Sequence, residues 1–314
     1  MSIAIELEGV NKRFGEKIAV DDMNLQVPSG ALYGIIGPNG AGKSTTLRMI
    51  LSILLPDSGR LSVLGKASAF EAKDRIGYLP EERGVYRKMK VGAFLEYMAR
   101  LKGLSGKVAK PRVAHWLERV GLADVAGKRC EELSKGMQQK VQFIAAVAHE
   151  PDLVILDEPF SGLDPVSMRL MRELFLEQHA RGATVLFSTH QMQHAEQLCD
   201  HIVMIHNGRK VLDDPLASIH ARSAPRALLL EPLDVSADVA AALADVAGLG
   251  DVSRDEGGWR LALKPFAELG TTVQAVAARV APLRLEVQRP SLEDLFIEIV
   301  TGSAAPGSVR AVAA

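Results

Sequence analysis

The sequence predicts an α/β protein with a smaller α+β domain after it, and three observations support this fold class. An apolar run at residues 31–36 leads into a glycine-rich loop and then into a helical pattern. Residues 153–156 are apolar throughout, which is typical of a strand buried on both faces of a parallel sheet. After residue 225 the pattern becomes strand, helix, strand, strand, helix, strand, which is a ferredoxin-like order.

The first part of the chain combines two kinds of strand with one helix. Residues 3–9 and 18–27 alternate apolar and polar side chains, as half-buried antiparallel strands do. The helix that follows the glycine-rich loop has an apolar face with i, i+3, i+4, i+7 spacing and is expected to continue to the Pro-Asp-Ser-Gly break at residue 56. This face consists of Leu47, Ile50, Leu51 and Leu54, and further strands are expected at residues 60–64 and 75–79.

The middle of the chain predicts a helical region and then a return to alternating strands and helices. Residues 91–150 are expected to be helical, with breaks at residues 103–106 and at Gly121. A helix over residues 165–181 leads to a strand at 183–188. Residues 202–205 and 209–212 predict a hairpin, because Asn207-Gly208 suits the positive φ angles of a type I′ turn.

A domain boundary is expected near residues 214–226, so that residues 1–220 form one domain and residues 225–300 a second. In the second domain, the sequence predicts strands at 227–231, 249–254, 258–263 and 284–289, and helices at 236–246 and 266–281. A last helix at 292–300 has Ser291 and Asp294 in capping-box spacing. The small and polar tail, residues 301–314, is expected to be disordered.

Composition excludes several classes of function. The 314 residues are 47% hydrophobic and have a net charge of −1, without the clustered positive charge that a nucleic-acid partner requires. No stretch approaches the length of apolar sequence needed for a membrane helix, and charge near the first residues argues against a secretory signal. Cys130 and Cys199 have no metal-ligand spacing and are expected to be reduced thiols.

The glycine-rich loop matches the phosphate-binding pattern G-x-x-x-x-G-K-[ST], with the strand and the helix that this motif requires on either side. Its glycines allow backbone N–H groups to surround phosphate oxygens, and the helix N-terminus adds positive potential. Lys43 is expected to reach the outer phosphates and the Ser44 hydroxyl to ligate Mg²⁺. The loop consists of Gly37, Pro38, Asn39, Gly40, Ala41, Gly42, Lys43, Ser44 and Thr45.

Two carboxylates follow the buried strand at residues 153–156. Asp157 and Glu158 are expected at the carboxyl edge of the sheet, where ligands bind in α/β folds. Asp157 would hold Mg²⁺, and Glu158 would polarise the attacking water as general base. An apolar run ending in Asp-Glu is a weak signal alone, and it becomes strong when it is paired with the phosphate-binding loop.

Together these motifs resemble those of the ABC-type ATPases, in the right order over about residues 3–220. Residues 133–139, Leu-Ser-Lys-Gly-Met-Gln-Gln, resemble the family's signature motif just before the acidic strand. Residues 161–164 resemble the D-loop, His190 the switch histidine, Phe14 the residue that stacks on adenine, and Glu81 occupies the Q-loop position. Phe14 as a core residue and His190 as a structural histidine are the alternatives to these two roles.

The resemblance implies an ATPase with ATP and Mg²⁺ as cofactors, acting as a head-to-tail dimer with a second copy or a paralogue. It implies that Ser134 and Gly136 contact the nucleotide bound by the other subunit, that Asp164 in the D-loop is a nucleotide-binding residue, and that Glu158, His190 and Lys43 are catalytic. Ser44, Asp157 and Glu81 would form the metal site. Within the helical subdomain, about residues 83–150, the segment at about residues 83–130 would receive the coupling helix of a separate transmembrane permease. This would place the protein on the cytoplasmic face of the membrane.

Residues 78–84, the extra C-terminal domain and residues 291–296 resemble sodium-export and drug-export ATP-binding subunits, so an exporter is the leading hypothesis. A soluble ABC ATPase acting on ribosomes or nucleic acid is the alternative, and an ATP sensor with a ligand-binding C-terminal domain is a third reading. The chain departs from the family pattern at Lys135 and Met137 in the signature and at Glu81, where a glutamine is usual. The change at Met137 puts a ribose contact in doubt, and Glu81 is expected to approach Mg²⁺ when the site closes.

Overall fold

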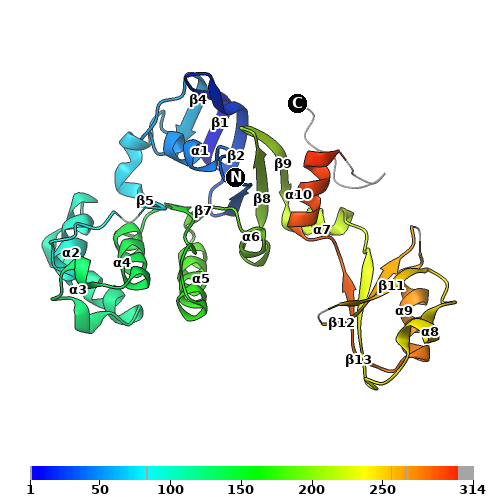
Figure 1. Cartoon of the computed structure of the whole chain (residues 1–314). Coiled ribbons are helices and arrows are strands. Elements are labelled where there is room, and N and C mark those ends of the chain that lie inside the picture. The colour runs from blue at the N-terminus through cyan, green and yellow to red at the C-terminus, as the bar shows by residue number, and fades with distance from the viewer. Residues whose placement is uncertain (1, 83, 256, 266, 303–314) are drawn as a thin grey trace. The chain divides into compact units, whose positions relative to one another are not determined.

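The chain forms two compact units, and each is described by itself (Figure 1). The computed structural model describes residues 2–302 apart from residues 83, 256 and 266. The first unit ends at Leu216 and the second begins at Ala217, inside the boundary region predicted from the sequence. Every residue predicted to bind nucleotide or metal lies in the first unit.

A six-stranded sheet forms the centre of the first unit. Its first five strands are parallel, and the sixth is antiparallel to its neighbour. The hairpin between the last two strands turns at Asn207-Gly208 with φ angles of 48° and 81°, as the type I′ prediction requires. In order across the sheet, the strands are β5 (Ile76–Leu79), β6 (Leu153–Asp157), β7 (Thr184–Thr189), β3 (Leu32–Ile36), β8 (His201–His206) and β9 (Arg209–Pro215).

An antiparallel sheet of three strands shares a hydrophobic core with the parallel sheet. Its strands are β2 (Lys17–Pro28), β1 (Ile3–Phe14) and β4 (Ser58–Val63), in that order across the sheet. The core draws Ile5 and Val20 from this sheet, Ile35 and Ile155 from the parallel sheet, and Leu47 from helix α1 (Lys43–Ile50). Because both sheets bury side chains in one cluster, the loop between β3 and α1 stands on a rigid base.

Helix α1 is shorter than predicted, since it ends at Ile50 instead of continuing through Leu54. Ser52 adopts a positive φ of 55°, and the N–H groups of residues 53 and 54 both donate to the Arg48 carbonyl oxygen. Leu51 and Leu54 still pack against the core. The apolar spacing therefore identified buried residues correctly. Two of them, Leu51 and Leu54, are brought to the core by a turn and not by the helix.

The region predicted to be helical contains three helices that contact one another, which Figure 1 shows in cyan and green. They are α2 (Val91–Leu101), α3 (Gly106–Arg119) and α4 (Lys135–Val147). The prediction was wrong between residues 120 and 134, which contain two single 3₁₀ turns, at Ala123–Val125 and Cys130–Glu132. Gly121 has a φ of 72° and ends α3 by directing the Leu122 N–H back to the Leu117 carbonyl oxygen.

The remaining short elements of the first unit connect its strands. A 3₁₀ helix over Ala69–Arg75 leads into β5, and helices α5 (Pro165–Ala180) and α6 (Met192–Leu198) flank β7 in the sequence. Helix α5 begins as its sequence suggests, with Asp164 as the N-cap and proline in the first turn. Asp164 accepts hydrogen bonds from two backbone N–H groups, of Val166 and Ser167.

The second unit has its own core and the predicted order of strands and helices. Its four strands lie in the order β11 (Leu249–Asp255), β12 (Gly258–Leu263), β10 (Ala227–Pro232), β13 (Pro282–Gln288), and all neighbours are antiparallel. This sheet order favours the ferredoxin-like assignment, which stays a prediction. Helices α8 (Val239–Leu243) and α9 (Leu269–Arg279) are shorter than predicted, and α7 (Leu216–Arg222) begins at the unit boundary.

The last helix, α10 (Leu292–Thr301), confirms the predicted capping box. The Ser291 hydroxyl accepts a hydrogen bond from the Asp294 N–H, and the Asp294 carboxylate accepts one from the Ser291 N–H. Thr301 belongs to this helix, so the predicted tail begins too early. Residues 303–314 of that tail lie outside the described residues.

Candidate functional site

The phosphate-binding loop joins the carboxyl end of β3 to the N-terminus of α1. Gly37 and Gly42 have φ angles of 153° and 110°. A Cβ atom at Gly37 would lie 2.2 Å from the Ile205 carbonyl oxygen, and one at Gly42 would lie 2.4 Å from the Ala19 carbonyl oxygen. Only glycine fits at these two positions, so the loop can run close to β8 and β2.

The N-terminus of α1 remains open for an anion. Its N-cap, Gly42, has no side chain to satisfy the first N–H groups, and its first turn contains no acidic residue. These N–H groups and the helix dipole together favour a phosphate.

Lys43 is buried beside the loop, with only 6% of its surface exposed. Its ammonium group donates hydrogen bonds to the carbonyl oxygens of Gly37, at 2.8 Å, and Pro38, at 3.2 Å. The same nitrogen lies 3.7 Å from Oε1 of Glu158. The structure therefore brings together the two residues predicted to contact the outer phosphate and the attacking water.

Asp157, at the end of β6, has hydrogen-bond donors at one carboxylate oxygen and none at the other. Its Oδ1 accepts hydrogen bonds from Ser44 at 3.2 Å and Ser188 at 2.5 Å. Its Oδ2 is buried and has no hydrogen-bond partner. A buried carboxylate oxygen without a donor is costly, so this arrangement fits a cation, and hydroxyl and carboxylate oxygens are ligands that Mg²⁺ prefers.

Glu158 is held in an uncommon backbone conformation, with a φ of 48°. Its carboxylate is 7% exposed. Oε1 accepts a hydrogen bond from the backbone N–H of His190 at 2.9 Å and lies 2.9 Å from Nδ1 of the same residue, and Oε2 accepts from the Thr189 hydroxyl at 3.2 Å. The strained backbone and these contacts aim the carboxylate toward Lys43.

A cavity of about 370 Å³ is lined by Lys43, Ser44 and Glu158. It also includes Phe14, whose ring is 49% exposed, and Glu81, which is exposed after the end of β5. Lys17 and Ala19 from β2 complete the side next to Phe14. The lining residues are Phe14, Lys17, Ala19, Asn39, Gly40, Gly42, Lys43, Ser44, Thr45, Glu81 and Glu158.

Gly37, Pro38, Ala41, Asp157 and His190 lie beside the lining residues without belonging to them, and Ser134, Gly136 and Asp164 form a separate group outside the cavity. Ser134 is the N-cap of α4, where its hydroxyl accepts a hydrogen bond from the Met137 N–H at 3.3 Å. A Cβ atom at Gly136 would lie 4.0 Å from a carboxylate oxygen of Asp164. Hydrogen bonds from Ser167 and Val166 lower the pKa of Asp164, so this carboxylate is charged.

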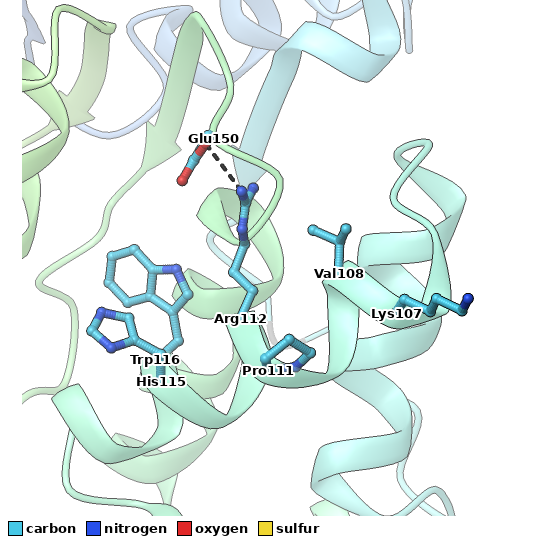
Figure 2. A pocket seen from close by; sticks show the side chains of 7 residues that line it. All are labelled: Lys107, Val108, Pro111, Arg112, His115, Trp116 and Glu150. Atoms are coloured by element: carbon cyan, nitrogen blue, oxygen red, sulfur yellow. Dashed lines mark ion pairs between the residues drawn. The ribbon is translucent and has the colours of Figure 1, made fainter.

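A second hollow, of about 460 Å³, lies against α3 and has a different chemistry (Figure 2). Arg112 reaches across it to Glu150 at 3.3 Å and also donates to the Ala148 carbonyl oxygen. Trp116 and His115 form another part of its lining. None of the predicted nucleotide or metal residues contributes to this hollow, so it is separate from the candidate site.

Sequence reasoning missed two hydroxyl groups that matter to the site. Ser188 and Thr189, at the end of β7, bond to Asp157 and Glu158 respectively. Their position directly before His190 was visible in the sequence. Their contact with the carboxylates arises from the pairing of β6 with β7, which brings Asp157 opposite Ser188.

The fold and the loop define a P-loop nucleotide-binding protein, and comparison with known proteins identifies the family. Residues 20–161 match the family model described as ABC transporter. An uncharacterized ABC transporter ATP-binding protein of Bacillus subtilis (strain 168) is 39% identical over 297 residues, which cover 94% of this chain and 98% of that protein. The Nod factor export ATP-binding protein I of Burkholderia pseudomallei (strain 1710b) is 35% identical, over 95% and 98% of the two chains.

Solved structures agree with this result. The structure of an ATP binding subunit of an ABC transporter superposes with a TM-score of 0.65 at 32% identity, over 70% of this chain and 92% of that one. The chain therefore belongs to the ABC transporter ATP-binding proteins. It is an ATP-binding subunit of an ABC transporter, and its enzymatic activity is ATP hydrolysis.

In the part of the chain that the structure describes, no helix has the length and apolar character needed to cross a membrane.

Proposed function

We propose that this subunit hydrolyses ATP in a site completed by a second ATP-binding subunit, and that hydrolysis drives a separate export permease. The observation that carries the proposal is the geometry around Glu158. Its buried carboxylate lies 3.7 Å from the Lys43 ammonium and is fixed by Thr189 and His190. A fixed, buried base beside a phosphate-binding lysine suits the activation of a water molecule for phosphoryl transfer.

The predicted site residues of the cavity each have a role in this proposal. The loop N–H groups and Lys43 bind the phosphates, while Phe14 stacks on the base. Ser44 and Asp157 would hold Mg²⁺, which neutralises phosphate charge when bound. The described residues include no group of three or more His, Cys, Asp or Glu side chains arranged for a metal ion, so the remaining ligands would be nucleotide oxygens and water. Glu81 would approach this metal shell on closure.

The need for a second subunit follows from the position of the signature residues. Ser134 and Gly136 begin α4 but do not line the cavity of their own chain. An N-terminus of this kind can present donors and a dipole to a phosphate on another subunit. In a head-to-tail pair, either a homodimer or a pair with a paralogue, Ser134, Gly136 and Asp164 of one subunit would complete the site of the other.

Export is supported by the relatives, several of which are named Nod factor export ATP-binding proteins. A polytopic permease would be the membrane partner, and it would hold the subunit on the cytoplasmic face of the membrane. No specific observation favours the alternative of a soluble ATPase on ribosomes or nucleic acid, since the net charge is −1. Co-purification of the full chain with a polytopic membrane protein tests the transport assignment, and tight association with ribosomes or nucleic acid instead would contradict it.

The catalytic proposal is tested by Glu158→Gln. The amide keeps the size of the side chain but cannot accept the proton of the attacking water, so we expect kcat to fall by about 10²-fold or more. ATP should still bind, and a closed dimer should accumulate in gel filtration with ATP. Lys43→Ala is the contrasting variant and should lose nucleotide binding itself. Hydrolysis at the normal rate by Glu158→Gln would remove Glu158 from the role of base.

A further inference from the structure

Helix α4 carries two buried glutamine side chains on one face. Gln139 is 3% exposed and Gln142 is 5% exposed. Their spacing of i, i+3 places them side by side on the helix. Because a buried amide is costly unless it is hydrogen-bonded, the partners of these side chains show what they hold.

Both amides reach backbone carbonyl groups next to predicted site residues, the catalytic Glu158 and the metal-site Glu81. Nε2 of Gln139 donates to the carbonyl oxygen of Pro159 at 3.2 Å, one residue after Glu158. Nε2 of Gln142 donates to the carbonyl oxygen of Glu82 at 3.2 Å, one residue after Glu81. Each acceptor is a carbonyl oxygen, so the amide nitrogen must face it in both cases.

The same helix begins with the residues proposed to act on the second nucleotide. Ser134 is its N-cap and Gly136 lies in its first turn. Helix α4 therefore connects three parts of the proposed catalytic site. It carries the signature residues at its N-terminus, and it contacts the segment after Glu158 and the segment after Glu81.

Gln142 also shows a sign of a role other than stability. Its Oε1 is buried and has no hydrogen-bond partner. An apolar side chain of similar volume would bury the same space without this unsatisfied oxygen. The presence of an amide at this position is therefore explained better by the Glu82 hydrogen bond than by packing.

We propose that Gln142 and Gln139 are positioning residues that fix Glu81 and Glu158 relative to the N-terminus of α4. This inference rests on the proposed function, because it assumes that Glu158, Glu81 and Ser134 act in hydrolysis. The two amides act through backbone carbonyl groups, and neither glutamine lines the nucleotide cavity. Their loss changes the alignment for the chemical step and leaves the phosphate-binding loop intact.

The test is Gln142→Met in the full chain, because methionine keeps the volume and removes the donor. We expect kcat to fall about 5- to 20-fold, while the Kd for ATP and the KM stay within about two-fold of the parent values. The melting temperature should not fall. Gln139→Met should behave in the same way. Gln178→Met is the matched control, because Gln178 on α5 is also buried, at 4% exposed, but its amide oxygen accepts a hydrogen bond from Arg181, the C-cap of that helix, and it does not line the cavity.

A double-mutant cycle then shows whether Gln142 acts through the segment of Glu81. If it does, adding Glu81→Gln to Gln142→Met lowers kcat by less than the product of the two single effects. If the two residues act independently, the double variant shows the full product of the two single effects on kcat, and the coupling is overturned. An unchanged kcat in Gln142→Met, or a loss of kcat that matches a loss of ATP affinity and of melting temperature, would overturn the positioning role. Gln142→Ala replaces Gln142→Met if the latter does not fold.

These outcomes are distinguishable from failure of the proposed function. If Glu158→Gln hydrolyses ATP normally, the proposed function fails first. If Glu158→Gln is inactive and Gln142→Met retains the parent kcat, only the present inference is wrong.

Discussion

Glu81 lines the same cavity as Ser44 and Glu158, at a position where related proteins are expected to carry a neutral glutamine. A carboxylate there adds negative charge close to the proposed Mg²⁺ site. This charge either attracts the metal or repels the outer phosphate, and the exposed position of Glu81 leaves the side chain free to approach the metal. The two effects can be separated by their dependence on Mg²⁺ concentration.

We predict that Glu81→Gln raises the Mg²⁺ concentration for half-maximal ATPase activity by several-fold, because an attractive charge is lost. The measurement is a titration of steady-state hydrolysis with Mg²⁺ at fixed total ATP. Glu82→Gln, one residue further along, is the control for a general change in charge. Identical Mg²⁺ curves for the parent and Glu81→Gln would exclude a role for Glu81 in the metal shell.

His149 lies buried at the end of α4, where Nε2 contacts the Ile76 carbonyl oxygen at 3.2 Å and Nδ1 is buried without a partner. Burial lowers the pKa of His149 to about 4, assisted by the charge of Lys102. The unfolded chain takes up the proton at its ordinary pKa of about 6.5, so it binds more protons than the folded chain between these two values. Above pH 6.5 the buried His149 therefore takes nothing from the free energy of unfolding. This free energy decreases as the pH falls from 6.5 toward 4.

We predict that His149 alone removes about 3 kcal/mol from the free energy of unfolding between pH 6.5 and pH 4. The measurement is urea unfolding of the parent and of His149→Gln at pH 7, 5.5 and 4.5. Glutamine keeps a donor and does not titrate, so the difference between the two proteins isolates the histidine. Parallel curves over this range would show that His149 does not control the acid sensitivity.

Residues with local signals were predictable and those with long-range partners were not. Gly37, Gly42 and Lys43 follow from one contiguous motif, because the loop, the strand before it and the helix after it are neighbours in sequence. The contact of Ser188 with Asp157 depends on the pairing of two strands that are about 30 residues apart. The hydrogen bond from Gln142 to Glu82 joins residues that are 60 positions apart, and the local sequence pattern does not predict it.

At the scale of elements, α4 packs against β5 through a glycine. A Cβ atom at Gly77 would lie 2.1 Å from the Ala146 carbonyl oxygen and 3.1 Å from Cγ of Pro151. The helix backbone thus approaches the strand more closely than any side chain permits. This close approach also fixes the distance between α4 and the segment that follows β5 and contains Glu81.

We predict that Gly77→Ala destabilises the protein by about 1–3 kcal/mol, because the added methyl group must push the backbone of α4 away from β5. Gly106→Ala is the control: Gly106 lies in the first turn of α3, and a Cβ there would meet nothing within 4 Å. The control should be neutral or slightly stabilising. Equal melting temperatures for the two variants would contradict the close approach of α4 and β5.

The elements themselves were predicted with uneven success, and the reason is physical. Strands β3 and β6 were found because every residue in each is buried, which leaves a continuous apolar run. Residues 120–134 were expected to be helical apart from a break at Gly121, and they contain buried apolar residues such as Val125 and Leu133. These residues are buried by irregular turns, and a pattern of burial alone cannot separate a turn from a helix.

At the scale of the whole molecule, each of the two units contains a hydrophobic core cluster of its own among the described residues. The core cluster around α1 draws only on residues between Ala4 and Ile205. The core of the second unit draws on residues between Leu228 and Leu285. The nucleotide cavity and the Asp157 and Glu158 carboxylates all belong to the first unit, whose boundary is Leu216. A unit that contains its own core and a complete set of cavity residues has what it needs to fold and bind by itself.

We predict that a chain ending at Leu216 folds and binds ATP with a Kd within about two-fold of the full chain. Circular dichroism would establish folding, and titration with a fluorescent ATP analogue would give the affinity. Lys43→Ala in the shortened chain is the control and should abolish the signal. A folded shortened chain that binds ATP ten-fold more weakly would show that residues 217–314 contribute about 1.4 kcal/mol to nucleotide binding. In that case the second unit would act on the site of the first, and its role would be regulatory rather than a separate binding function.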